Sequence, residues 1–260
     1  MAINDAREIP TAKRIVVKVG SSSISGDNAA QLETLVDALA AAHGRGAEVV
    51  LVSSGAIATG MPLLKLESKP EDLATSQALA SVGQSRLIAR YQAALEKSKI
   101  VAGQVLFTAA DLVGEETKAN AKRAMERLLE LRVLPIVNEN DTVATTEIRF
   151  GDNDNLAAQV AILLDADVLI LLSDIDALYD RPPKLEGAQR IEWVTFEDNL
   201  EGIQIGDTST GYGTGGAKTK VLAAKLTNRH GIPVLLTDTH KVAEALAGGR
   251  VGTWFEQEES

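Results

Sequence analysis

The chain has no cysteine, three histidines and only 3% aromatic residues in a length of 260. The lack of cysteine excludes disulfides, thiolate catalysis and cysteine metal sites. The formal net charge of -10 argues against broad nucleic-acid binding, which needs a basic surface. No apolar run approaches the roughly 20 residues of a membrane helix, and residues 1–14 lack the apolar core of a signal peptide. We therefore expect a cytoplasmic protein that binds no nucleic acid and no membrane.

Short apolar segments alternate with helical segments along the whole chain. The apolar segments have few charges and the segments between them show helical spacing, as in residues 31–46 and 115–132. Strands that are apolar throughout belong to mostly parallel sheets covered by helices on both faces. The pattern predicts an α/β fold, with a loose leader over residues 1–13, one domain over 14–256 and a tail over 257–260. A helix over 71–98 is expected to break near Gly83.

A polar stretch from Asn138 to Leu156 is the most unusual part of the sequence. It holds the groups NEND and GDNDN between two apolar runs. One Asp or Asn suffices to cap a helix, so this density exceeds what capping needs. We interpret the stretch as a site for a small charged ligand, with a solvated acidic loop as the alternative. Parallel sheets bind ligands at the carboxyl ends of their strands, and the polar clusters all follow predicted strands.

Two lysines lie beside glycine-rich segments. Lys18 ends an apolar strand and precedes the segment GSSS, while Lys220 follows GTGGAKT at the start of a predicted helix. Glycine lets backbone N–H groups approach an anion, and a helix N-terminus favours negative charge. The pair suggests a polyphosphate held between two loops, although the common P-loop pattern is absent. The alternative for Lys18 is a side chain that reaches solvent. The segment SSG at residues 53–55 is expected either to bind a carboxylate or phosphate or to form an ordinary tight turn.

Histidine is not a candidate for catalysis in this chain. His43, His230 and His240 each lie near a predicted helix end beside glycine or threonine. The two polar groups contain carboxylates but no histidine, and this suits Mg²⁺ held mostly by substrate phosphates rather than by a protein cage. Ser173 and Asp174, which end another strand, are expected either to contact a nucleotide or to cap and turn the chain.

Taken in order, these motifs resemble those of the glutamate 5-kinases, a group within the amino acid kinase family. The motifs are VVKVGSSS, VSSGAIATG, VNENDTVAT, FGDNDNLAA, LLSDIDALY, GTGGAKTK and VGTWF, and they cover about Lys13 to Phe255. The resemblance implies a three-layer αβα sandwich around a largely parallel sheet. It also implies ATP-dependent phosphorylation of the γ-carboxylate of L-glutamate to L-glutamyl 5-phosphate, the first step of proline biosynthesis, with Mg²⁺ accompanying ATP.

The resemblance also implies roles for individual residues. Lys18 and Lys220 match lysines that stabilise the transferred phosphoryl group, and Asp154 matches the aspartate that orients them. The glutamate-binding residues correspond to Ser54, Asp141 and Asn153. The ATP-binding residues correspond to Lys18, Gly20, Ser173, Asp174, Thr214, Gly215, Gly216, Ala217, Lys218, Thr219 and Lys220.

Some features depart from the family pattern or leave alternatives open. Many members carry a C-terminal PUA domain, for which this sequence leaves no room, and Ala217 stands where methionine is usual. The segment from 177 to 190 is expected to form a loop that is compact for this family, so the adenine contacts are open. Rival functions are an acetylglutamate, aspartate or uridylate kinase, or a non-catalytic sensor of an amino acid or nucleotide. The resemblance also suggests a homo-oligomer (dimer or tetramer) and feedback inhibition by proline.

Overall fold

The computed structural model describes residues 3–68, 70, 72–143, 153–198, 200 and 216–258. Their main feature is an eight-stranded sheet in the order β3-β4-β2-β1-β5-β9-β10-β8. Strand pairs are parallel except that between β9 and β10, which confirms the largely parallel sheet. The strands are β1 (Arg14–Val19), β2 (Glu48–Ser53), β3 (Ala102–Phe107), β4 (Leu134–Glu139), β5 (Val168–Ser173), β8 (Trp193–Val194), β9 (Val234–Asp238) and β10 (Thr253–Phe255).

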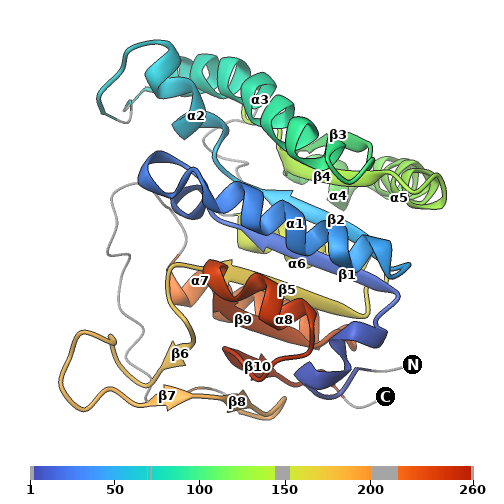
Figure 1. The fold of residues 1–260 in the computed structure, drawn as a ribbon, viewed down its shortest axis with the longest axis vertical. Coiled ribbons are helices and arrows are strands. Elements are labelled where there is room, and N and C mark those ends of the chain that lie inside the picture. The colour runs from blue at the N-terminus through green and yellow to red at the C-terminus, as the bar shows by residue number, and fades with distance from the viewer. Residues whose placement is uncertain are drawn as a thin grey trace.

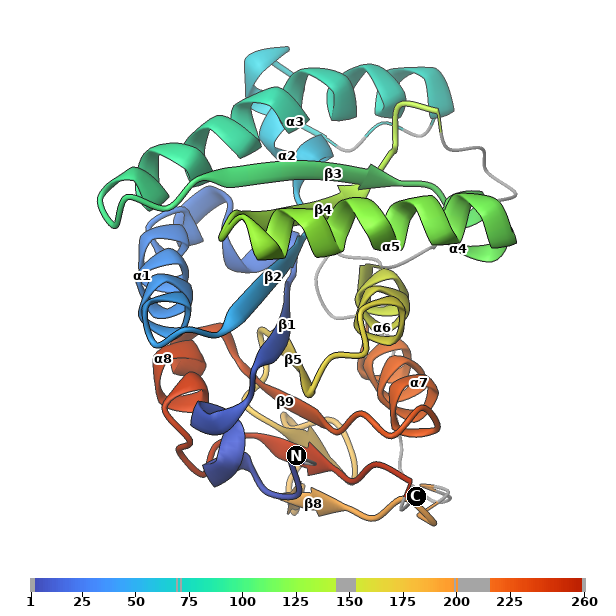
Figure 2. The ribbon, with the colours of Figure 1, turned by 90° about the vertical axis from the view of Figure 1, so that its right-hand side faces the viewer.

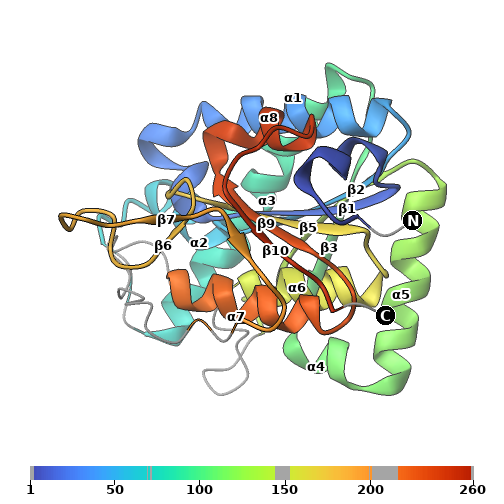
Figure 3. The same ribbon diagram turned by 90° about the horizontal axis from the view of Figure 1, so that it is seen from below.

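Helices cover both faces of this sheet, as the sequence predicts. Helices α1 (Gln31–Gly44), α3 (Leu73–Glu96) and α8 (Val242–Leu246) contribute to one apolar cluster. Helices α5 (Glu115–Glu130), α6 (Asn153–Leu163) and α7 (Ala217–Asn228) contribute to the other. Figures 2 and 3 show α1 and α8 on one side of the strands and α6 and α7 on the opposite side. The fold is therefore the three-layer αβα sandwich.

Shorter elements connect these layers. They are α2 (Ala56–Leu63), α4 (Ala109–Val113), the 3₁₀ turns η1 (Ala6–Thr11), η2 (Ser21–Ser23), η3 (Gly26–Asn28) and η4 (Thr239–Lys241), and a separate antiparallel hairpin of β6 (Leu178–Tyr179) and β7 (Arg190–Ile191). The hairpin extends away from the sheet at the lower left of Figure 1. Among the helices of the described ranges, none has the length and hydropathy to cross a membrane.

Strand β1 lies in the middle of the sheet and determines where the site forms. It pairs with β2 on one side and with β5 on the other, so the chain changes direction across the sheet at β1. Side chains alternate between the faces of a strand. Val17 belongs to the α1 cluster and Val16 to the α6–α7 cluster, so Lys18 shares the α6–α7 face.

The structure corrects three details of the sequence analysis. The leader expected over residues 1–13 is packed onto the core from Ile3 onward, because Ile3 and Ile9 are buried in the α1 cluster. Helix α3 is continuous through Gly83. A Cβ at Gly83 would lie 1.8 Å from the carbonyl oxygen of Ala56 in α2, so this glycine permits a close helix crossing instead of a break. The region expected to be a loop after Asp176 contains the β6–β7 hairpin.

Candidate active site

Two buried lysines share one buried carboxylate at the carboxyl end of β1. The ammonium group (Nζ) of Lys18 lies 2.5 Å from Oδ1 of Asp154, and Nζ of Lys220 lies 3.1 Å from Oδ2. The three side chains are 4%, 0% and 6% exposed for Lys18, Asp154 and Lys220. Buried charges require partners because the interior solvates them poorly. The structure therefore brings together the three residues expected to be catalytic.

Each residue of this cluster comes from a different element. Lys18 lies on β1, Asp154 in the first turn of α6 and Lys220 in the first turn of α7. Negative charge is favourable at a helix N-terminus, so α6 also stabilises the carboxylate. The hydroxyl of Thr219 donates to Oδ2 of Asp154 at 2.9 Å. Asp154 is thus held on both oxygens, and it fixes the two ammonium groups on either side of itself.

The glycine-rich segments are partly described. Gly20 lies beside the cluster, because a Cβ placed on it would be 4.0 Å from Nζ of Lys18. Gly216 is the N-cap of α7, Ala217 begins that helix and the side chain of Lys218 is exposed. The predicted ATP contacts at Thr214 and Gly215 lie outside the described residues. The described parts of the two glycine-rich segments, Gly20 and the start of α7, therefore both lie at the lysine–aspartate cluster.

Ser54 and Asn153 meet directly next to this cluster. The side-chain amide of Asn153 donates to the hydroxyl of Ser54 at 2.8 Å and to Oδ1 of Asn138 at 2.8 Å. Asn138 is the fifth residue of β4 and Ser54 follows β2, so two strand ends and the start of α6 converge here. The expected glutamate contacts Ser54 and Asn153 are therefore neighbours, and Asn153 adjoins Asp154 in sequence.

Asp141, the third expected glutamate contact, lines a cavity of about 210 Å³. This volume is several times the roughly 30 Å³ share of one water molecule in the liquid. Its walls come from α2, α3, β3, the end of β4 and the segment that follows. The residues lining it are Ala56, Ala80, Ser81, Gln84, Ser85, Gln104, Leu106, Glu139, Asn140, Asp141 and Thr142. Asn138 connects this cavity to Ser54 and Asn153, since its amide nitrogen donates to Oε1 of Gln84 at 2.8 Å.

Ser173 and Asp174 occupy the end of β5, the strand beside β1. Val19 of β1 pairs with Leu172 of β5. The predicted nucleotide residues, Ser173 and Asp174, directly follow Leu172 and therefore lie at the same edge of the sheet. The hydroxyl of Ser173 donates to Oδ1 of Asp174 at 3.2 Å. Both residues therefore lie at the sheet edge where β1 delivers Lys18.

Two of the three histidines make their contacts near helix ends, with backbone carbonyls outside the lysine–aspartate cluster. His43 contacts the carbonyl of Arg132 at the end of α1, and His230 contacts that of Leu226 near the end of α7. Among the described residues, no group of three or more His, Asp or Glu side chains could hold a metal ion. The described side chains of the lysine–aspartate cluster and its neighbours are lysines, carboxylates, amides and hydroxyls.

The sequence analysis missed four contributors. Gln84 was not singled out, Asn138 was read only as part of NEND, and Thr219 was assigned to ATP although its hydroxyl orients Asp154. Tyr91 donates to or accepts from the Ser53 hydroxyl at 2.8 Å, next to Ser54, and burial raises the pKa of its phenol. The signal for Gln84 was available: it lies at helical spacing between the buried Ala80 and Leu87, where a polar side chain needs a partner.

Comparisons with known proteins show which proteins the chain is similar to. Residues 13–238 match the amino acid kinase family. The chain is similar to a protein of Clavibacter sepedonicus named glutamate 5-kinase, with 69% identity over 247 residues that cover 95% of each chain. It is also 63% identical over 256 residues to a glutamate 5-kinase of Leifsonia xyli subsp. xyli, covering 98% of this chain and 95% of that one.

Two further matches are a longer relative with lower sequence identity and a solved structure with a similar fold. A glutamate 5-kinase of Thermobifida fusca is 51% identical over 253 residues, which span 95% of this chain and 65% of that protein. Among solved structures, the chain is similar to carbamate kinase from Giardia lamblia bound to AMP-PNP, with a TM-score of 0.69 and 18% identity. That alignment covers 96% of this chain and 100% of the carbamate kinase, and it supports the fold.

Proposed function

Because the chain belongs to the amino acid kinase family, we propose that it transfers the γ-phosphoryl group of ATP to the γ-carboxylate of L-glutamate. The product is L-glutamyl 5-phosphate. The observation that carries this proposal is the pair of buried lysines on Asp154, next to Ser54 and Asn153 and close to a polar cavity. The glutamate 5-kinase names of relatives with 69% and 63% identity support the choice of substrate.

The proposed chemistry is mainly electrostatic. A carboxylate that attacks ATP brings two anions together, so the protein has to neutralise charge and fix the geometry of in-line transfer. Lys18 and Lys220 would face the transferred phosphoryl group while Asp154 holds them in place. Such preorganised charges favour the transition state without further rearrangement. The γ-carboxylate is already ionised near neutral pH, so the reaction needs no general base and the absence of histidine from the described site is consistent with it.

The divalent metal that accompanies ATP, which we propose to be Mg²⁺, fits a site of this kind. Asp154 is engaged by two lysines and a threonine, so its chemistry suits orienting cations more than holding a metal. Mg²⁺ commonly keeps several waters and binds substrate phosphates with one or two carboxylates. When bound, it would neutralise phosphate charge. Asp174, at the edge proposed for the nucleotide, is a described carboxylate that would contact it.

The proposal extends to the protein's place in the cell. Residues 14–256 would act as one kinase domain in the cytoplasm, within a homodimer or homotetramer, and would perform the first step of proline biosynthesis. Proline shares the α-carboxylate and the amine of glutamate, so it should compete at an overlapping site. Inhibition that high concentrations of glutamate fail to relieve would exclude this overlap.

A coupled assay of ADP release tests the reaction. With Mg-ATP, the purified protein should release ADP when L-glutamate is present, and hydroxylamine should convert the acyl phosphate into a hydroxamate. N-acetylglutamate, aspartate and UMP serve as competing substrates for the rival kinases. Equal ADP release with N-acetylglutamate or aspartate would defeat the assignment, and ligand binding without turnover would favour a sensor.

A further inference from the structure

A row of buried amides connects the cavity to the start of α6. Asn153 donates through its amide nitrogen to Oδ1 of Asn138 at 2.8 Å, and Asn138 donates to Oε1 of Gln84 at 2.8 Å. All three residues are less than a tenth exposed. A third contact decides how these amides are oriented: the backbone N–H of Glu139 donates to the same Oδ1 of Asn138 at 2.9 Å.

That backbone contact fixes the direction of the whole row. A main-chain N–H can only donate, so the Asn138 atom that it meets must be the amide oxygen. The amide nitrogen of Asn138 must then be the atom that faces Gln84, and the Gln84 atom that accepts from it must be oxygen. The nitrogen of Gln84, with its two N–H donors, is therefore turned away from Asn138 at a residue that lines the cavity.

The backbone of α3 holds Gln84 in this position. Its neighbour Gly83 crosses α2 so closely that a Cβ would lie 1.8 Å from the carbonyl oxygen of Ala56. A second glycine, Gly60 of α2, meets α3 in the same way, with its Cβ position 2.3 Å from the carbonyl oxygen of Leu79. Packed elements of this kind position a binding group more rigidly than a loop does.

The cavity places opposite chemical groups near one another. Gln84 and the hydroxyls of Ser81 and Ser85 lie on α3, while carboxylates come from Glu139 at the end of β4 and from Asp141 after it. An α-amino acid presents an ammonium and a carboxylate on the same carbon, so it needs an anion and a donor side by side. The γ-carboxylate of such a ligand would extend past Asn138 toward Ser54, Asn153 and the lysines.

We propose that Gln84 is a specificity-determining residue that donates a hydrogen bond to the α-carboxylate of the substrate, beside the ammonium read by Asp141. The inference rests on the proposed function and adds the way in which the two ends of glutamate are told apart. The amide row fixes Gln84 as a donor. A site built to donate discriminates strongly against a ligand group that has no acceptor to offer.

The test compares L-glutamate with isoglutamine, in which the α-carboxylate is a carboxamide and the γ-carboxylate is intact. Gln84→Glu keeps an oxygen that accepts from Asn138, so the amide row persists, but it replaces the cavity donor by an anionic acceptor. This variant should lose efficiency with L-glutamate and gain it, relative to wild type, with isoglutamine, whose amide can donate to the new carboxylate. The kcat/KM for L-glutamate divided by that for isoglutamine should fall by at least about tenfold relative to wild type, the scale of one charged hydrogen bond.

Gln104→Glu is the matched control, since Gln104 also lines the cavity but lies on β3. It adds the same charge and measures the through-space penalty on the α-carboxylate alone, so its ratio should change less than that of Gln84→Glu. Equal changes in the two variants, or an equal loss of both substrates in Gln84→Glu, would overturn the role of Gln84.

A second variant covers the case in which Gln84→Glu does not fold. Gln84→Met removes the donor while keeping side-chain length, and it should raise the KM for L-glutamate with little change in kcat or in the KM for ATP. An unchanged glutamate KM would contradict the proposal. If the wild-type protein itself fails to phosphorylate L-glutamate, the proposed function fails, whereas a wild type that is active with indifferent Gln84 variants defeats only this inference.

Discussion

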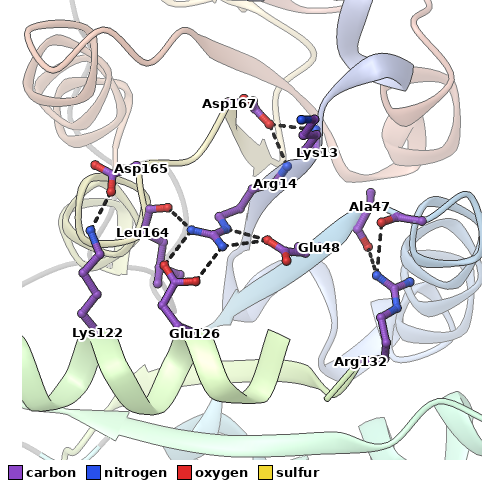
Figure 4. A network of polar contacts seen from close by, with 11 residues as sticks. Lys13, Arg14, Ala47, Glu48, Lys122, Glu126, Arg132, Leu164, Asp165 and Asp167 are labelled. Atoms are coloured by element: carbon purple, nitrogen blue, oxygen red, sulfur yellow. Dashed lines mark hydrogen bonds and ion pairs between the residues drawn. The ribbon is translucent and has the colours of Figure 1, made fainter. Parts of the chain in front are cut away.

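Basic side chains contact carboxylates at both ends of β1, but the two ends differ in the ratio of positive to negative charges. At the amino end, the guanidinium of Arg14 donates to Glu126 through two nitrogens at 2.9 and 2.8 Å, to Glu48 at 2.8 Å, and to the carbonyl of Leu164. Figure 4 shows these groups around Arg14, together with the carboxylate of Asp167, which accepts a hydrogen bond from the backbone N–H of Arg14. At the carboxyl end, as far as the structure describes the chain, two lysines share the carboxylate of Asp154.

This difference separates a structural cluster from the cluster that we propose to be catalytic. One cation faces two anions at the amino end, so its charge is fully compensated by the protein. Burial disfavours the charged guanidinium, but the hydrogen bonds of Glu126 and Glu48 outweigh that effect and raise the pKa of Arg14. Among the described residues, the two lysines at the carboxyl end meet the carboxylate of Asp154, an arrangement that suits the approach of a negatively charged phosphoryl group. Position on the same strand does not decide the role; the balance of charge does.

Removing one of the two lysines should produce the largest effect. Lys220→Ala should lower kcat by on the order of a hundredfold or more, as for loss of a strong electrostatic stabiliser of the transition state. Lys122→Ala is the control, because Lys122 pairs with Asp165 on the surface, with both side chains more than two-fifths exposed, and its kcat should stay at the wild-type value. A Lys220 variant with normal kcat and only a raised KM for ATP would assign this lysine to binding.

The amino-acid cavity offers a change of intermediate size. Asp141→Asn should weaken L-glutamate by at least about tenfold, because losing one partner of a buried charge pair costs roughly 2–5 kcal/mol. The KM for ATP and the melting temperature should be nearly unchanged. Asp174→Asn makes the same change at the proposed nucleotide site, and it should raise the KM for ATP while leaving the KM for glutamate unchanged. Unaltered glutamate affinity in Asp141→Asn would mean that another group reads the ammonium.

A change at the amino end should affect stability and leave catalysis intact. Glu126→Gln weakens the paired hydrogen bonds to Arg14, and charged hydrogen bonds contribute about 1.5–3 kcal/mol. Since Glu126 is 32% exposed, we expect the lower part of that range and a melting temperature lower by roughly 3–6 °C. Glu130→Gln on the same helix breaks only a surface pair with Arg127 and should change neither property. A loss of kcat in Glu126→Gln would contradict the separation of the two ends.

The smallest expected effect is a pH dependence at the end of α1. Burial, and then the nearby charge of Arg132, lowers the pKa of His43 in the folded protein. A lowered pKa means that the neutral form is favoured by folding, so the stabilisation is present above the unfolded pKa of about 6.5 and is lost as the pH falls below it. The melting-temperature difference between wild type and His43→Gln should therefore shrink between pH 8 and pH 5.5. A difference that is constant with pH would contradict this.

Much of the fold followed from the sequence because it depends on local patterns. Continuous apolar strands predicted the parallel sheet, and every polar cluster after a predicted strand lies at the carboxyl edge where the structure describes it. The leader was wrong because two isolated apolar residues, Ile3 and Ile9, carry no periodic signal although both are buried. The helix break predicted near Gly83 was wrong because a glycine that permits close helix packing looks the same in the sequence as a glycine that breaks a helix.

The site could be predicted only in part for a related reason. Lys18, Asp154 and Lys220 were found through motifs, but their mutual contacts depend on three elements meeting in space. The orientation of Gln84 required the backbone contact between Glu139 and Asn138, which no sequence pattern encodes. Likewise, Thr219 lies in a motif typical of nucleotide binding, and only the geometry assigns its hydroxyl to Asp154.

A paired measurement of kcat and melting temperature in Lys18→Met and Arg14→Met tests the central claim most directly. Both variants remove a positive charge from β1 and put the same apolar side chain in its place. We predict that Lys18→Met loses at least about a hundredfold in kcat with L-glutamate and Mg-ATP while its melting temperature stays close to wild type. Arg14→Met should melt several degrees lower and keep near-normal kcat. The reverse pattern, or equal losses of kcat in both variants, would contradict the account.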